Sequence, residues 1–235
     1  WSPLFGCDMS VFKKVAAFAA SIVLLTMANA FFTSIDIGSV GKLLNTEQLG
    51  IYARANFLAL IPVTFIANAV APVFLSVLRK ANTTKERFKT AFLKTLIVSL
   101  SAYLVCGIML ELASRWIVLL VYGERWLGVL TPFRIMIIFG CLKAATGIVP
   151  MAYILHDKPA LMVPPAFVLI VTMAAICIPM TQAYGIEGTA WAVVISFVAG
   201  QIAAFAFAWH VLTKHHPANS SHLDAGPLND SNVSS

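Results

Sequence analysis

Long apolar runs separated by short polar connectors make up almost all of the chain. Each run is long enough to cross the hydrocarbon core of a bilayer, which takes about 20 helical residues. The pattern therefore predicts six transmembrane helices, at about Ser10–Leu44, Ile51–Leu78, Ala91–Leu112, Leu127–Leu155, Leu161–Met180 and Thr189–Leu212. The expected fold class is all-α, and the expected protein is a polytopic membrane protein.

The stretches between the runs predict connectors of different kinds. Ala113–Trp126 is too short to cross the bilayer twice and contains several aromatic residues, so we expect a short helix or re-entrant turn near the membrane surface. Short connectors are expected at Asn45–Gly50, His156–Ala160 and Gln182–Gly188. From Lys214 on, the chain is rich in Pro, Ser and Asn, which predicts a disordered cytoplasmic tail (214–235) after a membrane domain (1–213).

The composition excludes an ordinary water-soluble domain. Hydrophobic residues make up 60% of the chain and charged residues only 11%, with a mean hydropathy of +0.87. Soluble domains contain roughly 25% charged residues. The net charge of +6 does not indicate nucleic-acid binding, because the cations lie in connectors between apolar runs. We therefore expect membrane lipids, and no nucleic acid, around this protein.

The densest cluster of positive charge predicts the orientation. Arg79–Lys94 holds six basic residues and one acid, Glu86, between two apolar runs. Short basic loops stay in the cytoplasm, because moving several cations across a membrane is costly. Six crossings then place both termini in the cytoplasm. Ten of the 16 basic residues lie inside in this arrangement: Lys13, Lys14, Arg79, Lys80, Lys85, Arg87, Lys89, Lys94, Lys158 and Lys214. Five lie outside: Lys42, Arg54, Arg115, Arg125 and Arg134.

Lys143, the remaining basic residue, is the sharpest candidate for chemistry. It falls near the middle of the fourth run, where a cation costs about 2.5–3.5 kcal/mol on insertion scales. At helical spacing it shares a face with Gly140, Gly147 and Pro150, whose small size leaves room for a ligand. We interpret it as a cation that faces a hydrated cavity and is offered to a phosphate or an acidic partner. The alternatives are a lysine whose amine reaches the membrane interface, or one paired with Asp36.

Two polar stripes flank the first predicted hairpin. Asn29 and Asp36 fall on one face of the first helix, and Arg54 and Asn68 on one face of the second. Facing each other, the stripes would line a cavity open to the outside. The candidate substrate-binding residues are therefore Lys143, Arg54, Asp36, Asn29 and Asn68. The alternative is an Asp36–Arg54 ion pair that only fixes the hairpin.

No pattern typical of an enzyme or a metal site is present. The four cysteines and five histidines show no metal-ligand spacing. No Ser/His/Asp arrangement, phosphate-binding loop or dinucleotide fingerprint occurs. We therefore expect a protein that is not an enzyme and that carries neither cofactor nor metal.

Several motifs together resemble one family. Ser34–Ala55, SIDIGSVGKLLNTEQLGIYARA, resembles a hairpin of bacterial polysaccharide and lipopolysaccharide O-antigen flippases. Tyr122–Trp126, YGERW, followed by LTPFRIMIIFG, looks like a second stretch of that family, and Tyr184–Ala192, YGIEGTAWA, is similar to its entry to a late helix. The opening WSP…DMS resembles the segment before the family's seventh helix. The resemblance covers roughly Trp1–Leu212, and the order and spacing of the motifs carry it.

The resemblance implies a fold and a function. The family belongs to the multidrug/oligosaccharidyl-lipid/polysaccharide exporter superfamily, whose members have two six-helix lobes around a central cavity. By resemblance, this chain is the C-terminal lobe, and the N-terminal lobe is its missing partner. Such proteins move undecaprenyl-diphosphate-linked oligosaccharides across the inner (plasma) membrane of bacteria for surface polysaccharide export. The resemblance supports Asp36 as a family-typical position, whereas Lys143 is inferred from the residues alone.

Two alternatives rank below this reading. A drug or cation antiporter of the same superfamily would favour carboxylates over a central lysine, and Asp36 is the acid that could serve. A membrane-embedded glycosyltransferase or polymerase would need a sizeable outer loop with catalytic residues, and the outer connectors here are short.

Overall fold

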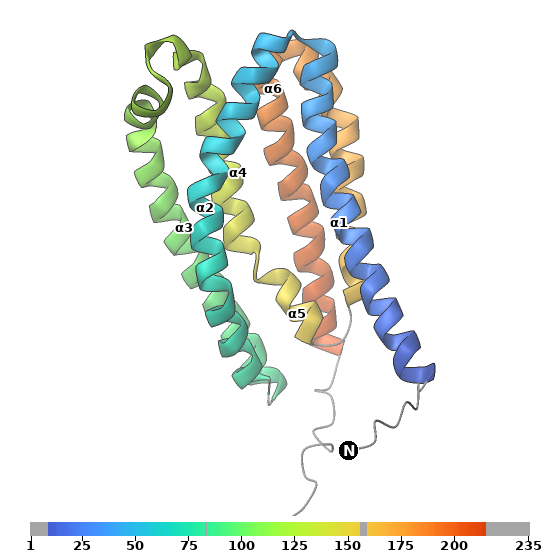
Figure 1. The fold of residues 1–235 in the computed structure, drawn as a ribbon. Coiled ribbons are helices and arrows are strands. Elements are labelled where there is room, and N and C mark those ends of the chain that lie inside the picture. The colour runs from blue at the N-terminus through green and yellow to red at the C-terminus, as the bar shows by residue number, and fades with distance from the viewer. Residues whose placement is uncertain (1–8, 83, 156–158, 215–235) are drawn as a thin grey trace, which may run out of the picture.

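The computed structural model describes residues 9–82, 84–155 and 159–214, and every element in this part of the chain is a helix (Figure 1). The elements are α1 (Met9–Leu43), α2 (Thr46–Ala81), α3 (Lys85–Tyr122), the 3₁₀ helix η1 (Glu124–Val129), α4 (Leu130–Thr146), α5 (Val149–Leu155), the 3₁₀ helix η2 (Pro159–Met162) and α6 (Val163–Lys214). The membrane-length apolar stretches in the described part are Val23–Leu43, Thr46–Ala81, Glu86–Tyr122, Glu124–Leu155 and Val163–Trp209. The chain is thus an all-α protein with five long apolar helical stretches, as expected of a polytopic membrane protein.

The first two helices form a hairpin with a very short connector. Asn45 caps α2, because its side chain accepts a 2.8 Å hydrogen bond from the backbone N–H of Gln48. The helix therefore begins at Thr46, and most of the connector predicted at Asn45–Gly50 is helical. Pro62 and Pro72 both lie inside α2, which continues through them.

The structure corrects the prediction for Ala113–Trp126. Most of this stretch is not a separate short helix, because α3 continues without interruption to Tyr122. No proline or glycine follows Gly107 before Gly123, so nothing removes a backbone hydrogen bond from the last turns. Gly123 ends the helix with a φ of +80°, a conformation that favours glycine, and η1 then turns the chain into α4. The long α3 therefore reaches beyond the predicted end of the third run.

The fourth predicted run, which was expected to be one crossing, is interrupted within the described residues. α4 ends at Thr146, and α5 begins at Val149 after a turn at Gly147 and Ile148. Pro150 explains the end of α4, since it has no N–H to donate to the carbonyl of Thr146. The predicted turn at His156–Ala160 lies partly outside the described residues. So does the predicted tail over 214–235, of which only Lys214, the last residue of α6, is described.

The last long helix doubles back on itself at Gly185. This residue has a φ of +62° and a ψ of −141°, which breaks α6 into two arms, residues 163–184 and 186–214. The arms pack antiparallel, because the Thr181 and Thr189 hydroxyl oxygens lie 2.8 Å apart and the Ser196 hydroxyl lies 3.6 Å from the Met173 sulfur. The connector predicted at Gln182–Gly188 is therefore a tight helical hairpin.

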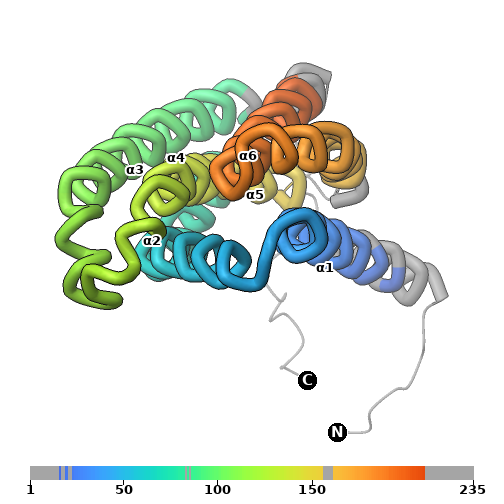
Figure 2. The backbone as a smooth tube through the Cα atoms, turned by 90° about the horizontal axis from the view of Figure 1, so that it is seen from above, coloured from blue at the N-terminus to red at the C-terminus, as the bar shows by residue number. Residues whose placement is uncertain are grey.

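All the long helices run lengthwise through one elongated bundle (Figure 1). The α1–α2 connector, η1 and the α6 turn lie at one end. The start of α1, the α2–α3 connector, α5 and the end of α6 lie at the other. Seen end-on, α4 lies between α2, α3 and α6 (Figure 2), and it contributes much of the buried core, including Phe133, Met136 and Phe139. α4 therefore holds its side chains in the centre of the bundle.

Candidate functional site

Lys143 lines a cavity of about 250 Å³ between α2 and α4. α2 contributes one wall, which includes Thr64 and Asn68, and Tyr103 of α3 contributes to another. The wall from α4 and the following turn includes Gly140 and Gly147, two of the small residues predicted to share the face of Lys143. The third, Pro150, lines a different cavity. The structure thus brings together Lys143 and Asn68 among the five predicted site residues.

The position of Lys143 along the chain places it half way along the length of the bundle. The residue lies about half way between Leu130 and Leu155, the two ends of the α4–α5 segment. Its side chain is half-buried, and the amine lies 5.5 Å from the centre of the Phe139 ring. Lys143 also stands in the last turn of α4, where the helix dipole favours a positive charge. The side chain therefore presents a cation to the cavity, partly stabilised by the carbonyl end of its own helix.

The α2 wall offers uncharged polar groups opposite this cation. The Thr64 hydroxyl donates to the backbone carbonyl of Leu60 at 2.8 Å, which leaves the hydroxyl oxygen available as an acceptor. Pro72 has no N–H to donate to the carbonyl of Asn68 four residues earlier, so α2 loses a helical hydrogen bond beside the cavity. The amide of Asn68 lies on the exposed wall of the same cavity. Together these groups can hydrogen-bond to water or to a polar ligand.

The break between α4 and α5 lies next to Lys143 and is stabilised by a hydroxyl from α3. The buried Ser99 donates a 3.1 Å hydrogen bond to the backbone carbonyl of Ala145, in the last turn of α4. A second hydroxyl, that of Thr146, donates to the carbonyl of Leu142 at 2.8 Å. Interrupted helices are tolerated at membrane depth only where such groups are satisfied or line a cavity. Ser99 was not among the predicted site residues, because a lone serine in an apolar run carries no signal in the sequence.

Asn29 lies in a separate cavity of about 310 Å³, formed by α1, α5 and both arms of α6. Gln201 lines the same cavity, and its side-chain oxygen is buried without a hydrogen-bond partner. Tyr153 closes one side and donates a 2.6 Å hydrogen bond to the carbonyl of Ala204. Asn29 and Asn68, one from each predicted stripe, therefore line two different cavities.

Asp36 is buried and engaged within the α1–α2 hairpin. Its carboxylate accepts a 2.9 Å hydrogen bond from the Tyr52 hydroxyl and a 2.7 Å bond from the backbone N–H of Ile37. The ion pair described between α3 and α4 joins Glu111 to Arg134, and no described ion pair joins Asp36 to a cation. The structure therefore supports neither the alternative Asp36–Lys143 pair nor the alternative Asp36–Arg54 pair.

Arg54 packs on aromatic rings at the end of the bundle that holds η1. Its guanidinium carbon lies 3.8 Å from the centre of the Trp126 ring and 6.0 Å from that of Tyr122. Cation–π contacts of this kind contribute about 0.5–1 kcal/mol at exposed sites. Arg54 thus ties α2 to η1 and lines neither the Lys143 cavity nor the Asn29 cavity.

Within the described residues, no group of three or more His, Cys, Asp or Glu side chains lies close enough together to hold a metal ion. The chemistry of the Lys143 cavity is instead that of a single cation with hydrogen-bonding neighbours. Such a site can bind an anionic or polar group.

Comparison with known proteins assigns the family. A family model described as "Polysaccharide biosynthesis protein" matches residues 1–131, which is more than half of the chain. The chain belongs to this family. The matched residues include Thr64 and Asn68 of the cavity and end before Lys143. The resemblance expected from the sequence motifs is thereby confirmed at the level of the family.

Two characterised relatives agree with this assignment. The chain is 28% identical over 145 residues to the teichuronic acid biosynthesis protein TuaB of Bacillus subtilis (strain 168), a match that covers 61% of this chain and 30% of TuaB. It is 27% identical over 152 residues to the amylovoran biosynthesis protein AmsL of Erwinia amylovora, covering 63% of this chain and 38% of AmsL. The match thus spans roughly a third of each relative's length, and no solved structure matches the chain.

Proposed function

We propose that this chain is part of a membrane transporter that flips undecaprenyl-diphosphate-linked oligosaccharide across the bacterial plasma membrane for surface polysaccharide export. The observation that carries the proposal is the Lys143 cavity in a membrane protein of the polysaccharide biosynthesis family. The named pathways of TuaB and AmsL, teichuronic acid and amylovoran biosynthesis, both produce polysaccharides and support the substrate class. The transporter role makes the chain a carrier and not an enzyme.

The physical problem of flipping fits the geometry of the cavity. A diphosphate must cross about 30 Å of hydrocarbon, where an unpaired charge is costly. Lys143 offers a positive charge half way along the α4–α5 segment, beside a break in the helix. Interrupted helices near the bilayer midplane are typical of substrate sites in transporters, because they place backbone groups and charges against the ligand. The polar groups on α2 can replace water around the sugar or phosphate oxygens during passage.

The topology proposed for this role has six crossings. The hairpin at Gly185 supplies two of them from α6, and the other four membrane-length stretches supply one each. The end of the bundle that holds the α2–α3 connector carries Arg79, Lys80, Arg87 and Lys89, so we place it in the cytoplasm. The first residue of α1, Met9, and the last residue of α6, Lys214, then both lie on the cytoplasmic side. Alternating access would move this bundle against a second lobe.

Complementation tests this proposal. The gene that encodes this chain is expressed in bacteria that lack their own polysaccharide flippase, and surface glycan and lipid-linked oligosaccharide are both measured. We expect surface glycan to return with the wild-type protein. Lys143→Ala should abolish surface glycan and cause lipid-linked oligosaccharide to accumulate, while Lys143→Arg should retain part of the activity because it keeps the charge. Lys42→Ala, which removes an exposed cation at the end of α1, serves as the matched control.

Normal export by the Lys143→Ala protein would remove the lysine from the mechanism. Failure of the wild-type protein to restore glycan, with insertion into the membrane verified, would contradict the flippase assignment for that glycan. A drug-resistance assay on the same cells then tests the antiporter alternative. That alternative ranks lower because the carboxylate of Asp36 is engaged by Tyr52 and lies outside the Lys143 cavity.

A further inference from the structure

A second site lies on the side of α4 that faces α3, away from α2. A groove of about 670 Å³ runs between α3 and α4, with Trp191 of α6 at one edge. This volume is within the roughly 300–1,000 Å³ typical of sites that bury a small organic ligand. Its lining is almost entirely apolar, with side chains such as Leu104, Ile108 and Ile138. The two charged residues that line it are Glu111 and Arg134, so the groove is apolar along its length and ionic at one place.

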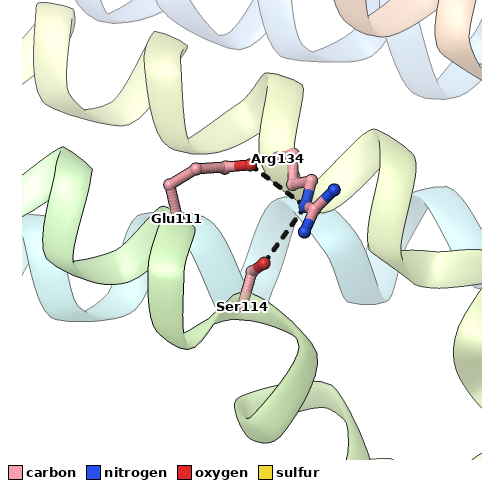
Figure 3. Close-up of polar contacts among 3 residues, drawn as sticks. All are labelled: Glu111, Ser114 and Arg134. Carbon is pink, nitrogen blue, oxygen red and sulfur yellow. Dashed lines mark hydrogen bonds and ion pairs between the residues drawn. The ribbon is translucent and has the colours of Figure 1, made fainter.

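The ionic part of the groove is a half-exposed pair. The Nε atom of Arg134 lies 3.0 Å from a carboxylate oxygen of Glu111 and donates a 3.1 Å hydrogen bond to the Ser114 hydroxyl (Figure 3). The side chains of Arg134 and Glu111 are 47% and 44% exposed. Both contacts use Nε, and among the described residues no hydrogen bond or ion pair engages the two terminal nitrogens of Arg134, to which no dashed line runs in Figure 3. The outer edge of the guanidinium therefore remains open to a planar or tetrahedral anion.

The pair lies close to the boundary between hydrocarbon and headgroups. Lys94 and Arg115 bracket a stretch of α3 of about 20 residues, which spans about 30 Å and carries Glu111 as its one charge. Glu111 therefore lies one helical turn inside the end marked by Arg115. Trp116, an exposed residue of the kind enriched at membrane interfaces, marks the same level. The apolar part of the groove extends from this level towards Leu100, in the direction of the bilayer centre.

This arrangement is complementary to one class of lipid. We propose that the α3–α4 groove binds phosphatidylethanolamine of the leaflet at the η1 end of the bundle (the outer leaflet in the orientation proposed above), with an acyl chain along the groove and the headgroup on the Glu111–Arg134 pair. The open edge of Arg134 suits the phosphate, because a guanidinium can donate two parallel hydrogen bonds to it. Glu111 suits the primary ammonium group of the lipid, which donates charge-assisted hydrogen bonds to a carboxylate. The pair and the headgroup each have no net charge, so neither leaves an uncompensated charge at the membrane boundary.

The same chemistry predicts weaker binding of two other common phospholipids. Phosphatidylcholine carries a quaternary ammonium group that has no N–H to donate to Glu111. Phosphatidylglycerol carries no ammonium group to donate to Glu111, so the carboxylate would lie near the lipid phosphate without a compensating bond to the headgroup, and the two anions would repel each other. This site should therefore bind phosphatidylethanolamine more tightly than phosphatidylcholine or phosphatidylglycerol. This preference does not depend on whether the protein flips a lipid-linked glycan.

Native mass spectrometry of the purified chain tests the proposal. The protein is delipidated in detergent and titrated with phosphatidylethanolamine, phosphatidylcholine or phosphatidylglycerol that carry the same acyl chains. We expect the first bound phosphatidylethanolamine to be favoured by about threefold to tenfold, the size of effect that one charge-assisted hydrogen bond gives in a half-exposed setting. Equal binding of the three lipids, preference for phosphatidylglycerol, or no bound lipid at all would overturn the proposal.

Four variants separate the parts of the site. Glu111→Gln should remove the preference for phosphatidylethanolamine over phosphatidylcholine, and Arg134→Gln should weaken binding of every phospholipid. Arg115→Gln, which removes an exposed cation at the same level but outside the groove, should change neither. Leu104→Trp fills the apolar part without touching the ion pair and should lower the affinity for all three lipids. Because Leu104 is largely exposed, a larger side chain there should not disturb folding. The Leu104→Trp protein can therefore test the groove even if variants that lack the ion pair do not fold. Unchanged preference in Glu111→Gln together with unchanged binding in Leu104→Trp would place the lipid elsewhere.

Discussion

The phenol of Tyr52 donates a 2.9 Å hydrogen bond to the buried carboxylate of Asp36 and so joins α1 to α2. Both side chains are almost completely buried, and the aspartate also accepts a bond from the backbone of Ile37. A buried carboxylate that loses a partner costs more than the hydrogen bond itself contributed, because its desolvation is no longer compensated. The contact is therefore important to the stability of the hairpin.

We expect Tyr52→Phe to destabilise the protein by about 1–3 kcal/mol, the cost of leaving one buried polar group unsatisfied. Thermal unfolding in detergent, followed by the fluorescence of the tryptophans, measures this as a lower midpoint. Tyr184→Phe removes a phenol that is 71% exposed and serves as the matched control. If the two variants unfold at the same temperature, the Tyr52–Asp36 bond contributes nothing to stability.

Ser99→Ala should weaken the junction between α4 and α5. The substitution removes the hydroxyl that satisfies the carbonyl of Ala145 at the break. Interhelical hydrogen bonds in membrane proteins contribute about 0.6 kcal/mol on average and at most about 1.7, so a modest loss of stability is expected. We also expect reduced glycan export in the complementation assay, because Lys143 lies within the same helical turn.

Ser101→Ala provides the comparison for Ser99→Ala, since Ser101 lies on the exposed face of the same helix. Export that is equal in the two variants would show that the α3 hydroxyl does not position the lysine. A stability loss without an export loss would assign Ser99 a purely structural role.

Two glycines of the α6 hairpin should not tolerate even a methyl side chain without a loss of stability. Gly185 has a φ of +62°, so Gly185→Ala should cost about 1–3 kcal/mol in backbone strain. At Gly188 a methyl group would overlap the backbone carbonyl of Met180 on the opposite arm, so Gly188→Ala must push the arms apart. Both variants should show lower unfolding midpoints than Gly38→Ala, because a methyl group at Gly38 meets open space within a helix. Unfolding midpoints equal to that of the wild-type protein in both Gly185→Ala and Gly188→Ala would contradict the close approach of the two arms.

The proposed orientation can be measured directly by cysteine labelling. In a background without the four native cysteines, Asn45→Cys places a thiol at the α1–α2 connector and Thr84→Cys places one at the α2–α3 connector. In intact cells, a membrane-impermeant maleimide should label Asn45→Cys. Thr84→Cys should react only after permeabilisation, because the basic connector stays in the cytoplasm. Labelling of Thr84→Cys in intact cells, with Asn45→Cys protected, would show that the protein has the opposite orientation.

Hydropathy predicted the helices well because apolar length alone determines whether a segment can span a bilayer. It failed at Ala113–Trp126 because the hydropathy falls near Arg115 although the backbone hydrogen bonds continue to Tyr122. A helix can extend past the hydrocarbon core, and only Gly123 ends it. The sequence thus located the crossing of α3 but not the helix end.

The candidate site was predictable only in part. Lys143 was found because a charge within an apolar run is conspicuous, and Asn68 because helical spacing placed it on a polar stripe. The contact of Ser99 with the carbonyl of Ala145 joins two helices, and helical spacing within one run gives no such information. The same holds for Arg54, which was expected near Asp36 but packs on Trp126, because an aromatic ring competes well for a guanidinium.

The tight turn of α6 also constrains how the protein is made. The two arms touch within a few residues of Gly185, so no linker is long enough to hold one arm in water while the other enters lipid. We therefore expect residues 163–214 to insert into the bilayer as one helical hairpin and not as two independent crossings. Both arms would then enter the membrane together and pack against α4, which precedes them in the chain.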